Sequence, residues 1–271
     1  MSVTLRLDRR GFFATAAALL IGLSQLIAPA PFKPAAAAET IRVGFSPEPY
    51  PPFWNQDAAG KWSGFEVDLL DALFAKMGKA YQLVPIAWDG IIPALKEKKI
   101  DVIFNSMGIT PERAQQVDFT DKYYETAMVF IGPKDQKVEI TKDGLKGKIV
   151  GVQTATAQAN WLQSHFGDAV EVKLYEQQDQ VNADLVAGRI DLDLADSIAL
   201  LQGFLPTEPG KAFEQKGEAV VDPASGANIG AALRKGDPLR DEISAAIRAI
   251  RADGTYKKIN DKYFNFDIYG Q

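Results

Sequence analysis

The sequence predicts an α/β protein built from two similar halves, each with a mainly parallel sheet flanked by helices. Beyond residue 38, short apolar segments with strand character alternate with segments whose apolar residues recur at helical spacing. This alternation is typical of βαβ units. The segment from Lys148 to Thr154 then repeats the strand and turn first met from Ile41 to Ser46. One layout therefore occurs twice along the chain.

The first half supplies the clearest individual elements. Residues 41–45 have the composition of a strand. Residues 65–77 place apolar side chains on one helical face and stop at Gly78, which predicts a helix that ends at a glycine C-cap. A short helix at residues 91–98 leads into a strand at residues 100–104. We expect these elements to form one βαβ layer.

The repeat extends to the residues that follow the helices. Ser106 and Asp196 occupy matching positions, each just beyond the carboxyl end of a predicted strand, where open α/β sheets bind ligands. Two lobes of this kind favour a ligand held in the cleft between them. Ordinary βαβ packing without a ligand is the alternative. The matching residues are Leu95, Ile100, Asp101 and Ser106 in the first half and Leu185, Ile190, Asp191 and Asp196 in the second.

Composition excludes several classes of function. Residues 39–271 carry 26 basic and 34 acidic residues, a balance that argues against nucleic acid or an anionic membrane as the main partner. The chain has no cysteine, so disulfides, thiol chemistry and Cys-ligated zinc are excluded. The single histidine, His165, lies in an amphipathic segment where we expect a structural role. Without a phosphate-binding glycine loop or a metal cluster, we expect no cofactor and no metal.

The N-terminal segment predicts export. Arg6, Arg9 and Arg10 precede an apolar run from Gly11 to about Ala28, and small residues up to Ala38 fit cleavage before Glu39. We therefore expect residues 1–38 to be a cleaved signal peptide and the mature protein to be soluble in the periplasm. A membrane anchor is the alternative, but the run is short for spanning. Residues 8–13 resemble a twin-arginine motif, which leaves both export routes open.

Four stretches of the mature chain resemble the family 3 bacterial solute-binding proteins, in the right order and over nearly its whole length. The resemblance is greatest to the branch that binds histidine, lysine, arginine and ornithine, or opines. The stretches are Tyr50-Pro-Pro-Phe53, Gly64-Phe-Glu-Val-Asp-Leu69, Ile100-Asp-Val-Ile-Phe-Asn-Ser-Met-Gly-Ile-Thr-Pro-Glu-Arg113 and Ala252-Asp-Gly-Thr-Tyr-Lys-Lys-Ile259.

This resemblance implies a two-lobed periplasmic-binding-protein fold of type II, with two crossover hinge strands. Lobe 1 would comprise residues 39–126 plus 227–271 and lobe 2 residues 127–226, with hinges near residues 125–129 and 224–230. It further implies a monomer that captures a small zwitterionic ligand for an inner-membrane ABC permease.

The resemblance also assigns the two charges that would hold the ligand. Arg113 matches the arginine that grips the ligand's α-carboxylate, a task for which a planar guanidinium fork is well suited. Thr110 and Pro111 would start the short helix that carries it. Asp196 matches the acid in lobe 2 that pairs with the ligand's ammonium. Taken alone, these residues would be interpreted as a surface arginine and a solvated aspartate at a strand end.

Further binding residues follow from the same resemblance. Thr156 and the backbone amide of Ala157 match carboxylate contacts in lobe 2, at a helix N-terminus that favours an anion, with Gln158 beside them. Tyr50 and Trp88 match the two walls of the side-chain pocket, where aromatic faces can sandwich a flat cation. Plain core packing is the alternative for both aromatic residues.

The turn that contains Asn105, Ser106 and Gly108 departs from the family pattern. The family often has serine or threonine at the position of Gly108, whose hydroxyl would bind the ligand's ammonium. We hypothesise that Gly108 makes room for a substituent on that nitrogen, as in opines, although a backbone conformation that needs glycine is an equal explanation. Members that select basic side chains place an acid where Pro47 stands here, and Glu48 is a possible replacement.

An enzyme on the same scaffold is the rival function, because periplasmic dehydratases of the arogenate and prephenate type resemble this family. Such an enzyme needs an acid or base directed at a leaving group. The predicted cleft offers Asp196 and Glu48, which are better explained as charge partners of a ligand. We therefore predict a binding protein with no catalytic residues.

Overall fold

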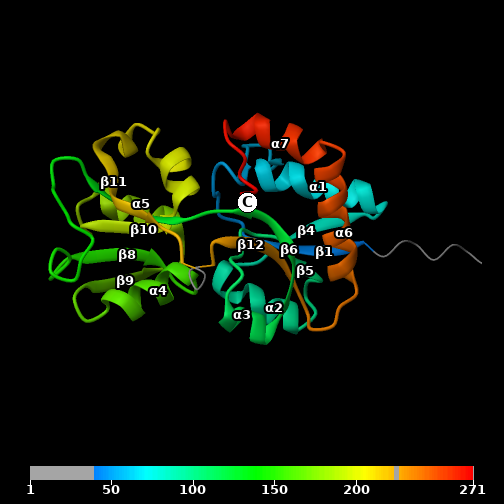
Figure 1. Cartoon of the computed structure of the whole chain (residues 1–271), viewed down its shortest axis with the longest axis horizontal. Coiled ribbons are helices and arrows are strands. Elements are labelled where there is room, and N and C mark those ends of the chain that lie inside the picture. Colours follow the sequence, from blue (N-terminus) through cyan, green and yellow to red (C-terminus); the bar gives the residue numbers. More distant parts are fainter. Residues whose placement is uncertain (1–39, 223–225, 271) are drawn as a thin grey trace, which may run out of the picture. The chain divides into compact units, whose positions relative to one another are not determined.

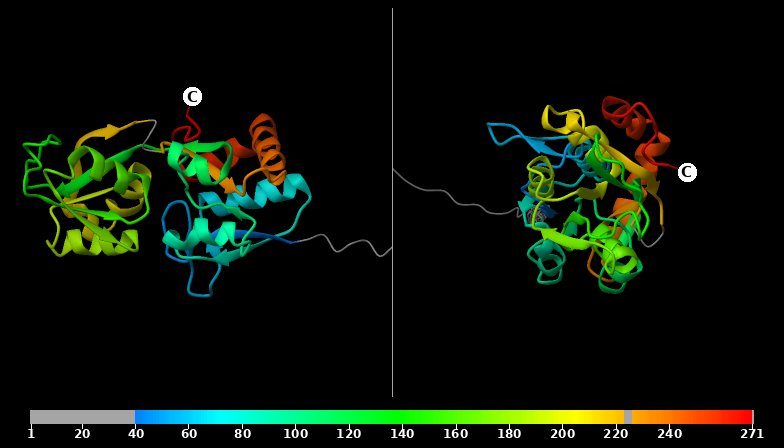
Figure 2. Two further views of the ribbon diagram at one scale, coloured as in Figure 1. Left: turned by 90° about the horizontal axis from the view of Figure 1, so that it is seen from below. Right: turned by 90° about the vertical axis from the view of Figure 1, so that its left-hand side faces the viewer.

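The computed structural model describes residues 40–222 and 226–270, which lie in a single unit, residues 37–271. The predicted signal peptide, residues 1–38, falls outside the described residues. Two five-stranded sheets organise the chain, and Figures 1 and 2 show them side by side with helices on both faces of each. No helix within residues 40–222 and 226–270 is both long and apolar enough to cross a membrane.

The first sheet has the strand order β4-β1-β5-β12-β6. Strands β4, β1 and β5 pair in parallel, while β12 pairs antiparallel with β5 and β6. A two-stranded ribbon, β2 and β3, lies before the first helix. The bounds are β1 Ile41–Phe45, β2 Asn55–Gln56, β3 Trp62–Ser63, β4 Tyr81–Pro85, β5 Val102–Ile103, β6 Asp118–Glu125 and β12 Asn228–Leu233.

The second sheet has the order β11-β7-β10-β8-β9. Strands β10, β8 and β9 pair in parallel, and β7 pairs antiparallel with β10 and β11. The chain passes from the first sheet to the second between β6 and β7 and returns between β11 and β12, so the antiparallel pairs within the two five-stranded sheets all involve these crossing strands. The bounds are β7 Met128–Pro133, β8 Ile149–Gln153, β9 Glu171–Tyr175, β10 Leu192–Asp196 and β11 Phe213–Val220.

Helices bury an apolar layer on each face of each sheet. In the first sheet α1, α6 and α7 cover one face, and α2 with residues near α3 closes the other. In the second sheet α4 packs on one face and α5 with the π-helical turn η2, Ala199–Phe204, on the other. The helices are α1 Phe65–Met77, α2 Ile91–Lys96, α3 Pro111–Gln116, α4 Ala157–Phe166, α5 Gln178–Val186, α6 Leu239–Ala252 and α7 Thr255–Tyr263, with 3-10 turns at Trp88–Gly90 and Pro209–Ala212.

Most of the predicted elements are confirmed. Strand β1 and helix α1 have the predicted bounds, and Gly78 ends α1 in the left-handed conformation that glycine favours. Helix α2 ends at Lys96, earlier than expected, because Lys98 adopts a φ of 60° that no helix accommodates. The strand expected at 100–104 pairs only over Val102–Ile103.

The two halves use the same anchor at the start of their central strands. The carboxylate of Asp101 accepts a hydrogen bond from the Arg42 amide, 3.0 Å away, and pairs with the Arg42 guanidinium. Asp191 accepts from the Ile149 amide at 2.9 Å and pairs with Lys148. The repeat thus places one acid five residues before Ser106 and another five residues before Asp196. Each acid ties the start of its strand to the neighbouring chain segment of the same sheet.

Candidate functional site

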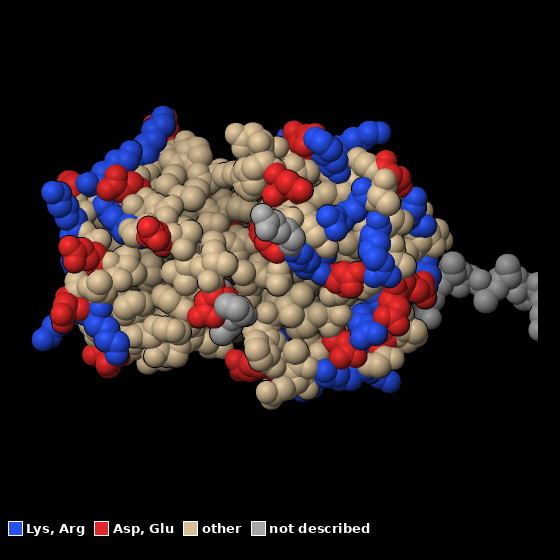
Figure 3. All heavy atoms as spheres, in the orientation of Figure 1, with Lys and Arg blue, Asp and Glu red and all other residues tan. Residues whose placement is uncertain are grey.

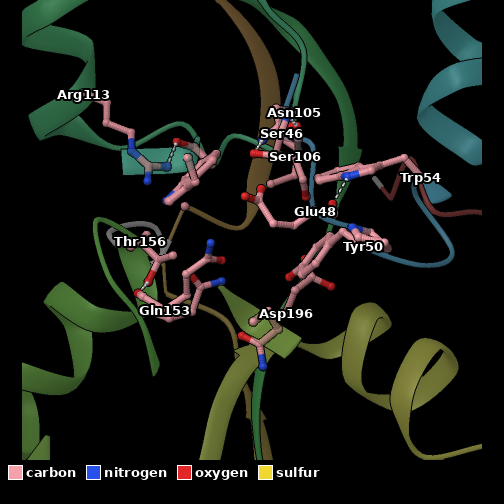
Figure 4. Close-up of a pocket in the computed structure, with 18 residues that line it drawn as sticks. Ser46, Glu48, Tyr50, Trp54, Asn105, Ser106, Arg113, Gln153, Thr156 and Asp196 are labelled. Atoms are coloured by element: carbon pink, nitrogen blue, oxygen red, sulfur yellow. Dashed lines mark hydrogen bonds between the residues drawn. The ribbon is translucent and has the colours of Figure 1, made fainter. Parts of the chain in front are cut away.

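A pocket lies where loops from both sheets meet (Figure 4). Charged side chains cover much of the outer surface on either side of the molecule, and the middle of the view in Figure 3 is mostly uncharged. All ten residues predicted from the sequence line this pocket, and eight others join them. The lining residues are Ser46, Glu48, Pro49, Tyr50, Trp54, Trp88, Asn105, Ser106, Gly108, Arg113, Gln153, Thr156, Ala157, Gln158, Gln178, Asp196, Gly226 and Ile229.

Arg113 projects into the pocket from the first turn of α3. The Thr110 hydroxyl caps this helix by accepting from the Arg113 amide at 3.2 Å, and Pro111 occupies the first turn, as predicted. The guanidinium donates to the Gly108 carbonyl at 2.9 Å and, across the pocket, to the Ala155 carbonyl at 3.0 Å. The guanidinium carbon of Arg113, Cζ, lies 5.3 Å from the centroid of the Trp88 ring.

The Arg113 guanidinium is buried without an anionic partner among residues 40–222 and 226–270. The residue is only 8% exposed, and burial lowers its pKa to about 10, with the charge of Glu112 acting in the opposite direction. A guanidinium has five N–H donors, and the two carbonyl contacts leave several of them for another acceptor. The arrangement favours an anion, and a carboxylate matches the geometry of the fork.

The start of α4 adds backbone donors beside Arg113. The Thr156 hydroxyl accepts from the Ala159 amide at 3.0 Å and donates to the Gln153 carbonyl at 2.7 Å, so Thr156 caps a helix that begins where a helix N-terminus was predicted. The amides of Ala157 and Gln158 belong to the first helical turn and have no intrahelical acceptor. Arg113 and this helix start together make a corner of the pocket that favours an anion.

Asp196 lies on the opposite side of the pocket from Arg113 (Figure 4). It ends β10, is 3% exposed, and its Oδ1 atom accepts from the amides of Ile198 and Ala199 at 2.8 and 3.2 Å. Burial raises its pKa to about 6, while hydrogen bonds from Thr126 and the two amides act in the opposite direction. Asp196 therefore provides a negative charge near neutral pH that a ligand cation can approach.

Tyr50 and Trp88 both line the pocket and pack against the core. Tyr50 stacks on Phe53 at a centroid distance of 5.8 Å and packs against the core of the first sheet, while it also lines the pocket. Trp88 packs against the cluster beneath α2 and faces Arg113. Its indole N–H is buried and has no acceptor among the described residues. Burial and then the charge of Asp196 raise the pKa of Tyr50, so its hydroxyl stays a neutral donor.

The turn after β5 is held in place by hydrogen bonds to the buried residues Ser46 and Glu66. Asn105 exchanges two hydrogen bonds with Ser46, each 2.9 Å long. Ser106 adopts a φ of 53°, and its amide donates to Oε1 of the fully buried Glu66 at 2.8 Å. Burial raises the pKa of Glu66 to about 8, so this carboxyl is largely protonated at neutral pH. The Ser106 hydroxyl bonds to that of Tyr124.

Gly108 does not open space in the way that we expected. A Cβ atom at this position would lie 2.5 Å from the carbonyl oxygen of Gly226, and the Cα of Gly226 would be 3.0 Å away. The backbone of the returning chain fills the volume that a side chain would take. Close backbone approach therefore explains the glycine, and no room for a substituent is created in this direction.

Eight residues that line the pocket lie outside the ten that the sequence predicted to bind the ligand. Ser46 follows β1 and Gln153 is the last residue of β8, so the strand-end rule that indicated Ser106 and Asp196 also applies to them. Glu48, the replacement that the sequence offers for the acid missing at Pro47, accepts from the side-chain amide of Gln177 at 2.9 Å. Gln178 gave no signal, because a glutamine at the start of a helix is common on surfaces.

Comparisons with known proteins agree over most of the chain. Residues 41–266 match the model of the bacterial extracellular solute-binding proteins, family 3. An L-arginine-binding protein of Pseudomonas aeruginosa is 43% identical over 238 residues, 87% of this chain and 92% of the relative. A lysine/arginine/ornithine-binding periplasmic protein of Escherichia coli is 40% identical over 258 residues, 94% and 97% of the two chains.

A solved structure titled an ancestral arginine-binding protein bound to arginine matches with a TM-score of 0.77 and 36% identity, over 83% of this chain and 98% of that one. These proteins are named as binding proteins and not as enzymes, and their agreement in sequence and fold extends over most of the chain. The two-lobed α/β chain therefore belongs to the bacterial extracellular solute-binding proteins, family 3, and is a binding protein rather than an enzyme.

Proposed function

We propose that this protein is the periplasmic substrate-binding component of an ABC importer and that its ligand is a basic amino acid, arginine being the first candidate. One observation carries the proposal. Arg113 and Asp196 are both buried, line opposite sides of one pocket, and do not pair with each other among the described residues. A zwitterion satisfies both charges at once, with its carboxylate on Arg113 and the start of α4 and its ammonium on Asp196.

The rest of the pocket favours a cationic side chain. Glu48 adds a second acidic group to the lining, and the aromatic faces of Tyr50 and Trp88 stand beside the polar groups. The relatives with the names of arginine-binding and lysine/arginine/ornithine-binding proteins support the same class. The ligand would connect residues 39–126 and 227–271, which we propose as lobe 1, with residues 127–226 as lobe 2. A monomer closed in this way would deliver it to an inner-membrane permease.

An N-substituted amino acid such as an opine is the second ligand class. Its support came from the missing side chain of Gly108, and that space is filled by the backbone of Gly226. The structure therefore gives this class less support than the free amino acids. It stays in the ligand panel as octopine, because octopine keeps the arginine side chain and changes only the α-nitrogen.

Thermal unfolding of the purified protein against a ligand panel tests the proposal. The panel comprises the common amino acids, ornithine, octopine and arogenate. A ligand at a hundredfold its Kd adds about 2.7 kcal/mol of stability, which for a domain of this size raises the Tm by roughly 5 to 11 °C. We expect the largest rise with arginine, lysine, ornithine or histidine. A rise with octopine or arogenate alone, and none with arginine, lysine, ornithine or histidine, would contradict the proposal.

A further inference from the structure

A buried acid, Asp193, lies directly behind the pocket. It is the second residue of β10, three residues before Asp196, and is 0% exposed. Both of its carboxylate oxygens accept from the side-chain amide of Gln178, at 3.1 and 3.0 Å. An acid in the interior of a sheet is costly unless it is paired, so its presence in β10 calls for a functional explanation.

Asp193 determines which end of the Gln178 amide reaches the pocket. Gln178 is the first residue of α5, is 8% exposed and lines the pocket. Its Nε2 atom donates to Asp193 and contacts Asn182 Oδ1 at 3.3 Å, which uses its two N–H groups. Its Oε1 atom accepts no hydrogen bond from the described residues. When Asp193 is ionised, rotating the amide by half a turn would place this oxygen against a carboxylate, so the ionised acid leaves Oε1 for the ligand as an acceptor.

The charge of Asp193 also reaches the lining residues. After burial, the charges of Asp196, Asp193 and Glu66, in that order, raise the pKa of Tyr50. The neighbouring Gln177 donates to Glu48 at 2.9 Å, which brings a second carboxylate to the α5 side of the pocket. A positively charged ligand group with N–H donors would meet an uncharged acceptor here, Oε1 of Gln178. The carboxyl groups of Glu48 and Asp193 lie beside and behind this acceptor.

Burial alone disfavours the ionised form of Asp193. It raises the pKa of Asp193 to about 8, and the hydrogen bond from Gln178 acts in the opposite direction. A cation held against Oε1 of Gln178 supplies the positive charge that the described surroundings of this carboxyl do not provide. Ionisation of Asp193 and capture of a cationic side chain therefore favour each other.

We propose that Asp193 is a specificity-determining residue that acts through Gln178. It holds the amide so that Oε1 faces the ligand, and it selects a side chain that ends in a guanidinium or ammonium group over a neutral one of the same shape. This inference rests on the proposed function and assigns a role to two residues outside the set predicted from the sequence.

The test compares L-arginine with L-citrulline, in which an uncharged urea replaces the guanidinium at nearly the same size. Calorimetry at pH 7.5 gives the ratio of their Kd values for the wild type, Asp193→Asn and Gln178→Met. Asp179→Asn is the matched control, because it removes the same charge one residue from Gln178 on the exposed side of α5. We expect the preference for arginine to fall at least tenfold in the first two variants and to change less than threefold in the control.

The outcomes separate this inference from the function on which it rests. If the wild type binds no basic amino acid, the proposed ligand class and the inference both fail. If the wild type prefers arginine and Asp193→Asn keeps that preference in a folded protein, only the role of Asp193 is refuted. Should Asp193→Asn not fold, Gln178→Met decides, because it removes Oε1 and leaves the buried acid in place. An unchanged arginine preference in Gln178→Met overturns the inference.

Discussion

Replacing Arg113 by methionine separates the binding role of its guanidinium from its contribution to the fold. The fold loses two hydrogen bonds, to the carbonyls of Gly108 and Ala155. It also loses a buried charge, because burial lowers the pKa of Arg113 well below its ordinary value, to about 10. That fall corresponds to roughly 3 kcal/mol against the charged form, which is comparable to two hydrogen bonds from a charged donor at about 1.5 kcal/mol each. We therefore expect the unfolding free energy to change by less than about 2 kcal/mol.

Binding responds very differently to the same substitution. A bidentate contact between guanidinium and carboxylate contains two charge-assisted hydrogen bonds worth about 3 to 6 kcal/mol together. At 1.4 kcal/mol for each factor of ten, the Kd for arginine rises by roughly 100- to 10,000-fold. Calorimetry gives the Kd, and urea unfolding without ligand gives the stability of the same preparations.

Arg113→Lys is the graded control, because it keeps the charge and removes the planar fork. We expect an intermediate loss of affinity, roughly 10- to 100-fold, since a lysine ammonium cannot match both carboxylate oxygens in the same way. A folded Arg113→Met protein that binds arginine within tenfold of the wild type would refute the assignment of the carboxylate to this corner of the pocket.

Three further outcomes follow from the described contacts. Affinity for the amino acid falls as the pH drops through about 6, because Asp196 then takes up a proton and the ligand's ammonium loses its partner; constant affinity in calorimetry from pH 8 to pH 5 would exclude this pairing. Gly108→Ala lowers the unfolding free energy by about 1 to 3 kcal/mol in urea, because the new Cβ meets the Gly226 carbonyl. Gly90→Ala, whose Cβ meets nothing within 4 Å, is the control and leaves stability nearly unchanged. Glu66 has a folded pKa of about 8 against an ordinary 4.5, so its contribution to stability is complete below pH 4.5 and is lost as the pH rises through 8, by up to about 1.4 kcal/mol per pH unit. In Glu66→Gln the decline of stability between pH 5 and pH 8 is therefore shallower than in the wild type, and equal slopes in urea unfolding would contradict the assignment.

Local patterns were sufficient for the elements that carry the site. Strand β1, helix α1 with its Gly78 cap, and the Thr110 cap of α3 depend on residues close together in the sequence, and their propensities and capping groups agree with the fold. The repeat also located the strand ends at Ser106 and Asp196. Because parallel sheets present these ends at one edge, residues distant in the chain could be assigned to one pocket, which they line.

The sequence by itself thus determined the α/β class, the two similar halves and the positions of Arg113 and Asp196 at the ends of regular elements. Only the tertiary structure decided how Gly108 and Gln178 function. Gly108 is a glycine because the chain returns to it at Gly226, and Gln178 presents an oxygen because α5 packs on the strand that contains Asp193. These contacts join segments whose separation is set by the register of the strands and the packing of the helices. No local propensity encodes that geometry.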